Sequence, residues 1–221
     1  MTVSTNLAAI RERIEAAATR AHRDPAAVRL IGVTKGVDPS RVHQALDAGL
    51  LDFGENFVQE AETRIAALEA AATSAEWHFI GHLQSNKIAA ALNLFDIIQS
   101  VDSLRLAEQI NRRADAKIRV LLEVNVAQEA SKFGFAPAEV SAAVARIGSL
   151  DHLELTGLMT VAPAGLDSGS VRPVFRELRE LAAANGLEEL SMGMTDDFEA
   201  AIEEGATMVR IGRAIFGERP S

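Results

Sequence analysis

The sequence predicts an α/β fold in which a single (β/α)8 barrel of the TIM type follows one extra N-terminal helix. Three observations lead to this prediction. Eight short apolar runs lie between residues 28 and 211, and stretches with helical spacing of apolar residues separate them. The clearest runs are apolar on both faces, as are the strands of a parallel sheet covered by helices. No Pro-, Gly- or Ser-rich linker interrupts the 221 residues, so we expect one domain, residues 1–221.

The expected strands are apolar segments bounded by glycine, proline or polar turns. The segment 118–124 is the clearest, because apolar side chains occupy both of its faces. In chain order the eight expected strands are residues 28–34, 51–54, 77–81, 95–99, 118–124, 153–159, 189–193 and 207–211.

The expected helices begin with residues 5–22, which place apolar side chains on one face and are expected to cover the bottom of the barrel. The second helix starts at Asp38, an N-cap followed by Pro39, and ends at Gly49. A third carries one apolar face between residues 57 and 72. A fourth helix is expected after the turn 82–87, and a fifth after Asp102, which would be its N-cap. Two more are expected from Pro137 to about Gly148 and from the loop 163–170 to Asn185. The last covers residues 196–204 and opens with an Asp-x-x-Glu capping pattern.

An open, doubly wound sheet is the alternative architecture. The chain is slightly short for a closed barrel, so its loops have to be tight. The first expected strand is not followed by the glycine fingerprint that a dinucleotide-binding sheet carries at that point, and this favours the barrel.

Charge and composition narrow the class of partners. Acidic residues outnumber basic ones by 31 to 22, the net charge is −9, and no Lys/Arg cluster could follow a phosphate backbone, so nucleic acid is not expected as a partner. The absence of cysteine fits a reducing compartment. Charged residues at helical spacing occupy the N-terminus, where a signal peptide would carry an apolar block. No apolar run reaches membrane-spanning length. We therefore expect a cytoplasmic protein with no membrane partner, and we expect it to be a monomer.

Lys35 is the first candidate functional residue. It ends the apolar run that starts at Arg29 and stands before Gly36. An ammonium at the end of a buried strand is poorly solvated, which lowers its pKa and favours the nucleophilic amine that a Schiff base requires. The alternative is that Lys35 only marks where the strand leaves the core and extends its charge into water.

A second group of candidates follows the last two expected strands. In a barrel the carboxyl ends of the strands face the active site, and the loops after strands seven and eight often hold phosphate. Ser191 and Thr195 supply hydroxyl groups there, and Arg210 and Gly212 follow at the end of the eighth strand. Glycines at strand ends are also common for structural reasons alone. An amine facing such a phosphate cradle is the arrangement of a pyridoxal 5'-phosphate (PLP) site.

Seven segments of the chain match a known family in order. They are Val33 to Lys35, Phe53 to Glu60, Trp77 to Lys87, Lys132 to Phe135, Gly157 to Thr160, Ser191 to Asp196 and Arg210 to Gly217. With them the chain resembles the pyridoxal phosphate homeostasis protein family, single-domain relatives of the alanine racemase N-terminal barrel.

The resemblance implies a role for each candidate. Lys35 would carry PLP as a Schiff base, and Arg210 would face the nitrogen of the pyridine ring. Ser191, Thr195 and Gly212 would bind the phosphate. A further contact at the side of the ring would come from Asn56. The family function would be intracellular PLP homeostasis and amino and keto acid balance, with delivery to PLP-dependent apoenzymes left open.

Other polar residues are weaker candidates. Lys87 and Lys132 lie in polar loops, where solvated or substrate-contacting roles fit better than a buried imine. His78 and His82 would fall on a strand and a turn, so they are not expected to share a metal ion. Glu55 lies near the mouth, where it could act as an acid or base or only face solvent.

Three functions remain open on the sequence alone. The favoured one is a PLP carrier or regulator without robust catalysis. The second is a PLP-dependent racemase, for which we expect weak activity because the tyrosine that acts as the second base in the resembling racemases has no counterpart in this tyrosine-free chain. The third is a phosphate-binding barrel enzyme in which Lys35 acts without PLP.

Overall fold

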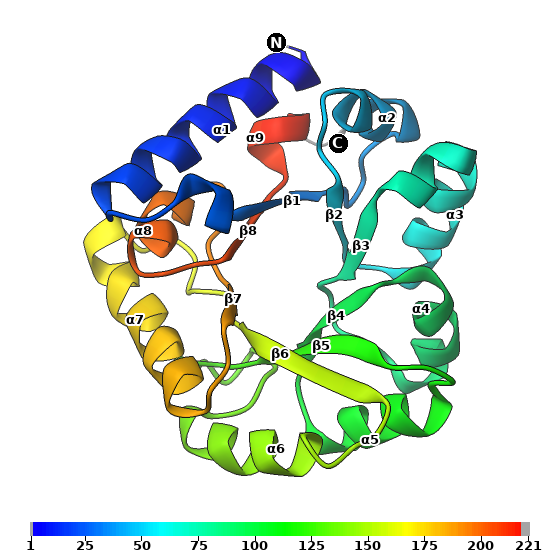
Figure 1. The fold of residues 1–221 in the computed structure, drawn as a ribbon, viewed down its shortest axis with the longest axis vertical. Coiled ribbons are helices and arrows are strands. Elements are labelled where there is room, and N and C mark those ends of the chain that lie inside the picture. The colour runs from blue at the N-terminus through cyan, green and yellow to red at the C-terminus, as the bar shows by residue number, and fades with distance from the viewer. Residues whose placement is uncertain (1, 218–221) are drawn as a thin grey trace.

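The computed structural model of the chain describes residues 2–217 and shows a closed barrel of eight parallel strands surrounded by helices (Figure 1). The strands follow one another around the barrel in chain order, and β8 pairs with β1 to close it. The (β/α)8 fold expected from the sequence is confirmed. Met1 and residues 218–221, the two ends of the expected domain 1–221, lie outside the described residues.

The strand positions agree closely with the expected ones, and the range of β6 is the expected range. The strands are β1 (Arg29–Val33), β2 (Asp52–Glu55), β3 (Glu76–Phe79), β4 (Ile97–Val101), β5 (Ile118–Glu123), β6 (Leu153–Met159), β7 (Glu189–Ser191) and β8 (Met208–Ile211).

The helices alternate with the strands and form the outer ring of the molecule (Figure 1). They are α1 (Val3–Arg20), α2 (Pro39–Asp47), α3 (Val58–Leu68), α4 (Ile88–Leu94), α5 (Leu104–Arg113), α6 (Val140–Ile147), α7 (Ser168–Ala184), α8 (Phe198–Glu203) and α9 (Arg213–Phe216), with short 3-10 turns η1 (Pro25–Ala27), η2 (Glu69–Ser74), η3 (Ser85–Lys87) and η4 (Pro137–Glu139). Within residues 2–217, no helix combines the length and the apolar character that crossing a membrane requires.

Helix α1 does not cover the bottom of the barrel as expected. It lies at the outside of the ring beside α8 and α9, and it also contacts α2 (Figure 1). The last helix, α9, has only four residues, and α1 packs beside it. The apolar face of α1 therefore takes the place in the ring that the eighth helix holds in a regular barrel.

The start of α5 also differs from the expectation. Ser103 is its N-cap, and its hydroxyl oxygen accepts a hydrogen bond from the backbone N–H of Leu106 at 3.3 Å. Asp102 is turned toward the loop after β3, where one of its carboxylate oxygens lies 3.0 Å from Nδ1 of His82.

Helix α8 begins later than the expected Asp196. The carboxylate of Asp197 accepts a hydrogen bond from the backbone N–H of Met194 at 2.6 Å, which closes a turn before the helix. Asp196 forms an ion pair with Arg213 on the next loop. The segment after β7 is therefore a turn at the carboxyl end of that strand.

The interior of the barrel is unusually polar. TIM barrels are usually filled by layers of branched apolar side chains. Here the apolar part is the small cluster of Ile97, Leu121 and Met159, separate from the larger core between strands and helices. The side chain of Met208 also lies in the interior, beside Gln99, together with buried polar side chains of four strands: His78, Gln99, Ser191 and Arg210.

A buried ion pair fixes the loop that carries Lys35. The fully buried carboxylate of Glu55, at the end of β2, accepts hydrogen bonds from Oγ1 of Thr34 at 2.7 Å and from Nε of Arg64 at 2.6 Å. The guanidinium of Arg64 also donates to the carbonyl oxygen of Val37. The residues on both sides of Lys35 are thereby tied to β2 and α3.

Burial makes the protonation state of Glu55 depend on its partners. The pKa of Glu55 is raised because burial disfavours its charged form, while the hydrogen bonds from Thr34 and Arg64 oppose the rise. The second carboxylate oxygen, Oε2, has no hydrogen-bond partner among the described residues. The charge of Glu55 therefore depends on Arg64, and removal of the guanidinium would leave a buried, unpaired carboxylate.

We expect Arg64→Met to lower the free energy of unfolding by about 3 kcal/mol at neutral pH. Without the guanidinium the pKa of Glu55 rises further, so the carboxyl is protonated in the folded state as the pH falls, and the loss should shrink in mildly acidic buffer. Urea denaturation at both pH values measures this.

The double variant Glu55→Gln/Arg64→Met should recover a large part of the lost stability, because it removes the stranded charge. Arg112→Met, at an exposed position on α5, is the matched control and should be nearly neutral. An equal loss at both pH values, with no recovery in the double variant, would contradict the assignment.

Candidate functional site

Lys35 and Gly212 line one pocket at the carboxyl end of the barrel. Lys35 lies two residues beyond the end of β1, and Gly212 follows directly after β8, the neighbouring strand. The pocket has a volume of about 360 Å³, and Val33, Val37 and Arg213 also line it. Two sequence candidates that are far apart in the chain are thus brought together.

The ammonium of Lys35 contacts an aromatic ring. Its Nζ lies 4.8 Å from the centre of the ring of Phe57, whose side chain is 46% exposed. No carboxylate of residues 2–217 lies within ion-pair distance of this ammonium. The contact of the Lys35 ammonium with Phe57 is therefore a cation–π contact and not an ion pair.

The other lysines are placed differently. Lys132 forms an ion pair with Glu129 and donates to the carbonyl oxygen of Val161 at 3.1 Å. Lys87 lines a second pocket, described below, and Lys117 is exposed between α5 and β5. Of the four lysines, Lys35 is the one that lines the pocket with Gly212.

Gly212 and the turn after β7 have backbones that close neighbours constrain. A Cβ at Gly212 would lie 3.1 Å from the carbonyl oxygen of Val33, on the strand that leads to Lys35. Gly193 has a φ of +93° and packs so closely on α8 that a Cβ would lie 2.5 Å from that of Ala201. Thr195 is half-buried in this turn, and the backbone N–H of Arg210 donates to the carbonyl of Gly193.

Arg210 is a buried cation near the mouth. Its side chain donates to Oγ of Ser191 at 2.7 Å and to the carbonyl oxygen of Thr160 at 2.8 Å. Burial lowers its pKa to about 10, while the nearby carboxylates of Glu123 and Asp197 oppose this shift. The guanidinium therefore keeps its charge at neutral pH.

Ser191, a predicted phosphate ligand, has its side chain in the interior of the barrel. Its side chain is fully buried inside the barrel, where it accepts from Arg210 and donates to Oε1 of Gln99 at 2.6 Å. Both partners lie in the interior, and the single hydroxyl hydrogen of Ser191 is directed to Gln99. Of the two hydroxyls expected to bind phosphate, only that of Thr195 is partly accessible.

Asn56 lies on a neighbouring pocket of about 290 Å³, together with Phe57, His82 and Lys87. Phe57 therefore contacts the Lys35 ammonium and also lines the pocket of Asn56. The backbone of Asn56 is fixed by close packing, since a Cβ at Gly81 would lie 2.1 Å from its carbonyl oxygen.

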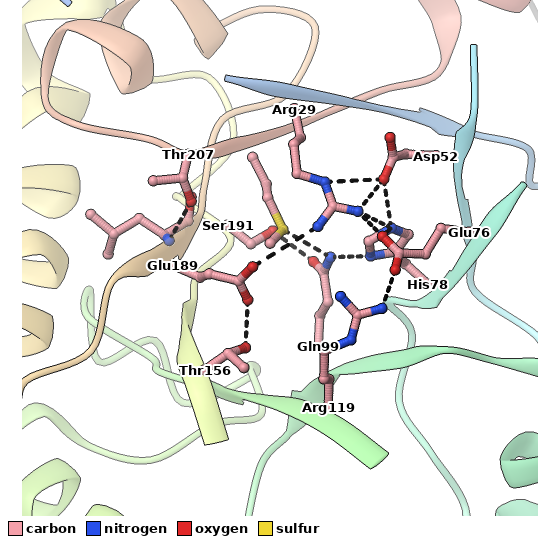
Figure 2. Close-up of polar contacts among 12 residues, drawn as sticks. Arg29, Asp52, Glu76, His78, Gln99, Arg119, Thr156, Glu189, Ser191 and Thr207 are labelled. Carbon is pink, nitrogen blue, oxygen red and sulfur yellow. Dashed lines mark hydrogen bonds and ion pairs between the residues drawn. The ribbon is translucent and has the colours of Figure 1, made fainter. Parts of the chain in front are cut away.

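His82 and His78 do not share a site. His82 lies at the rim, where its ring stacks on that of Phe133 with centroids 4.0 Å apart. His78 is fully buried and lies near Asp52 and Glu76 toward the amino end of the strands (Figure 2). The guanidinium of Arg29 donates to both of these carboxylates. An arginine cation thus fills the position that a metal ion would need.

Sequence reasoning missed Gln99 and gave His78 no role. Each is a polar residue in an otherwise apolar strand, and this interruption was the available signal. The structure places Gln99 between His78 and Ser191, with hydrogen bonds to both.

Comparison with known proteins agrees with this geometry. Residues 5–220 match the family model of the alanine racemase N-terminal domain. The pyridoxal phosphate homeostasis protein of Pseudomonas aeruginosa is 44% identical over 223 residues, which cover 99% of this chain and 96% of that protein. The Bos taurus protein of the same name is 40% identical, over 96% of this chain and 86% of that protein.

Solved structures give the same result. PipY of Synechococcus elongatus with PLP bound has a TM-score of 0.86 and 34% identity, covering 98% of this chain and 100% of that one. Alanine racemase of Corynebacterium glutamicum, at 20% identity and a TM-score of 0.70, shares the fold over 97% of this chain and 62% of its own. The chain therefore belongs to the alanine racemase N-terminal domain family and, within it, to the pyridoxal phosphate homeostasis proteins.

Proposed function

We propose that this protein binds PLP through Lys35 and serves in the cytoplasm in PLP homeostasis and in the balance of amino and keto acids. The observation that carries the proposal is the shared pocket of Lys35 and Gly212 at the carboxyl end of the barrel. The names of the relatives and the PLP-bound PipY structure support it.

The residues present fit this cofactor. When bound, PLP supplies an aldehyde that condenses with an amine and an electron-withdrawing ring. Lys35 provides the amine, and its contact with Phe57 holds it at the mouth. Gly212 lines the pocket beside Lys35 and is proposed to bind the phosphate through its backbone, and the half-buried hydroxyl of Thr195 is the second proposed phosphate contact. Asn56 is proposed to contact the side of the ring.

Arg210 is proposed to face the ring nitrogen. Its guanidinium can only donate hydrogen bonds, and it carries a charge at neutral pH. A positive charge beside the nitrogen disfavours protonation there, which keeps the ring a weak acceptor of electrons. This property suits a carrier, and we propose that the monomer passes PLP to apoenzymes that depend on it.

A racemase is the second candidate, favoured by the match to the alanine racemase N-terminal domain. It would need a base on each face of the substrate. Lys35 can serve one face. His82, paired with Asp102 at the rim, is the candidate for the other. The charged Arg210 would slow removal of the α-proton, so we propose that racemisation is at most a weak side activity.

Adding PLP to the protein should produce a visible absorption band from an imine, and borohydride should abolish it. The physical reason is that the amine of Lys35 condenses with the cofactor's aldehyde. Absorption spectra are recorded before and after reduction. The control variant Lys117→Ala should keep the band, because that lysine is exposed and does not line the pocket. Absence of the band would favour a phosphate-binding enzyme that does not use PLP.

Thr195→Ala should weaken PLP binding without unfolding the chain. The change removes a hydrogen bond to a charged phosphate, worth about 1.5 to 3 kcal/mol, or roughly a ten- to hundredfold loss of affinity. Equilibrium titration with PLP measures the dissociation constant. The control is Thr63→Ala, at an exposed position on α3, which should bind normally. An unchanged constant for Thr195→Ala would place the phosphate elsewhere.

A further inference from the structure

A column of hydrogen bonds runs through the interior of the barrel from Arg210 to the amino end of the strands. Arg210 donates to Ser191, and the hydroxyl of Ser191 lies 2.6 Å from Oε1 of Gln99. Nε2 of Gln99 lies 2.9 Å from Nδ1 of His78, whose Nε2 lies 3.2 Å from the carboxylate of Asp52. Figure 2 shows the lower part of this column, where the side chains of Ser191, Gln99 and His78 point toward one another.

The direction of the column is set at Arg210. A guanidinium has only donors, so Oγ of Ser191 must accept from it. The single hydroxyl hydrogen of Ser191 is then free for the other neighbour, which must be an acceptor. That neighbour is the carbonyl oxygen of the Gln99 side chain. The amide nitrogen of Gln99 is thereby turned toward His78.

A sulfur atom fixes the same orientation of Gln99 independently. Sδ of Met208, on β8, lies 3.5 Å from Nε2 of Gln99. A thioether sulfur can accept a hydrogen bond but cannot donate one. The two hydrogens of the amide nitrogen thus go to His78 and Met208. In the reversed orientation, an oxygen would face the sulfur and the hydrogen of Ser191 would point at a donor.

The tautomer of His78 follows from this orientation. Nδ1 accepts from Gln99 and so carries no hydrogen. Burial lowers the pKa of His78, so the ring is neutral and its one hydrogen is on Nε2, directed to Asp52. Arg29 lies 3.4 Å from the same nitrogen, but it donates to the carboxylates of Asp52 and Glu76 instead.

We propose that Gln99 and His78 are positioning residues for Arg210: a one-way chain of hydrogen bonds from Arg210 through Ser191, Gln99 and His78 to Asp52 holds the guanidinium in place. In each of the four hydrogen bonds that link these residues, the donor lies on the Arg210 side and the acceptor on the Asp52 side. The ion cluster of Arg29, Asp52 and Glu76 closes the chain at its far end. The effect of this arrangement on PLP binding rests on the proposed function, whereas the series of hydrogen bonds itself does not.

The tautomer of His78, measured in protein without added PLP, tests the proposed direction of these hydrogen bonds. Long-range ¹⁵N–¹H NMR spectra near neutral pH should show hydrogen on Nε2 and a bare Nδ1. In Gln99→Glu both side-chain oxygens are acceptors, so Nδ1 should carry a hydrogen as well, while Nε2 keeps the one directed to Asp52. Thr63→Ala should leave the His78 signals unchanged. A hydrogen on Nδ1 of His78 in the natural protein would overturn the proposal. This measurement on the natural protein tests the proposal even if the variant fails to fold.

A titration separates this inference from the proposed function. Gln99→Met keeps the length of the side chain but cannot hold the hydroxyl hydrogen of Ser191, so Arg210 is less well fixed. PLP affinity should fall roughly two- to tenfold. Unchanged affinity together with the expected tautomers would overturn the positioning role. Failure of the natural chain to bind PLP, with the expected tautomers present, would overturn the proposed function alone.

Discussion

The burial of the Arg210 guanidinium is the constraint on which the rest of the barrel interior depends. A permanent charge inside a closed barrel needs hydrogen-bond acceptors. Among residues 2–217, two atoms accept from this guanidinium, Oγ of Ser191 and the carbonyl oxygen of Thr160. Ser191 in turn needs Gln99, and Gln99 needs His78. One buried cation thus explains why this barrel is filled with polar side chains where apolar layers are usual.

The two ends of the barrel use charge in opposite ways. At the amino end, Arg29 and Arg119 are matched by Asp52 and Glu76, so the cluster is closed by its own ion pairs. At the carboxyl end, the ammonium of Lys35 faces a ring and a pocket with no carboxylate of residues 2–217 in contact. The ion pairs of the amino-end cluster satisfy one another, whereas the Lys35 ammonium has no ion pair with residues 2–217 and is the group that we propose to react with a ligand.

Local pattern was enough to predict the barrel and the meeting of Lys35 with Gly212, because parallel strands bring all their carboxyl ends to one side. It did not show that Ser191 is fully buried, because the depth of a side chain inside a barrel depends on the stagger between strands. Gln99 was missed because its partner Ser191 is 92 residues away in the chain. The position of α1 followed from the shortness of α9, which the sequence did not show.

Locating the pyridoxyl group after borohydride reduction tests most directly whether Lys35 holds the cofactor. The reduced protein is digested and its peptides are analysed by mass spectrometry. The structure predicts the label on the peptide that contains Lys35, the lysine that lines the pocket with Gly212. A label found mainly on Lys87, Lys117 or Lys132 would contradict the proposed site.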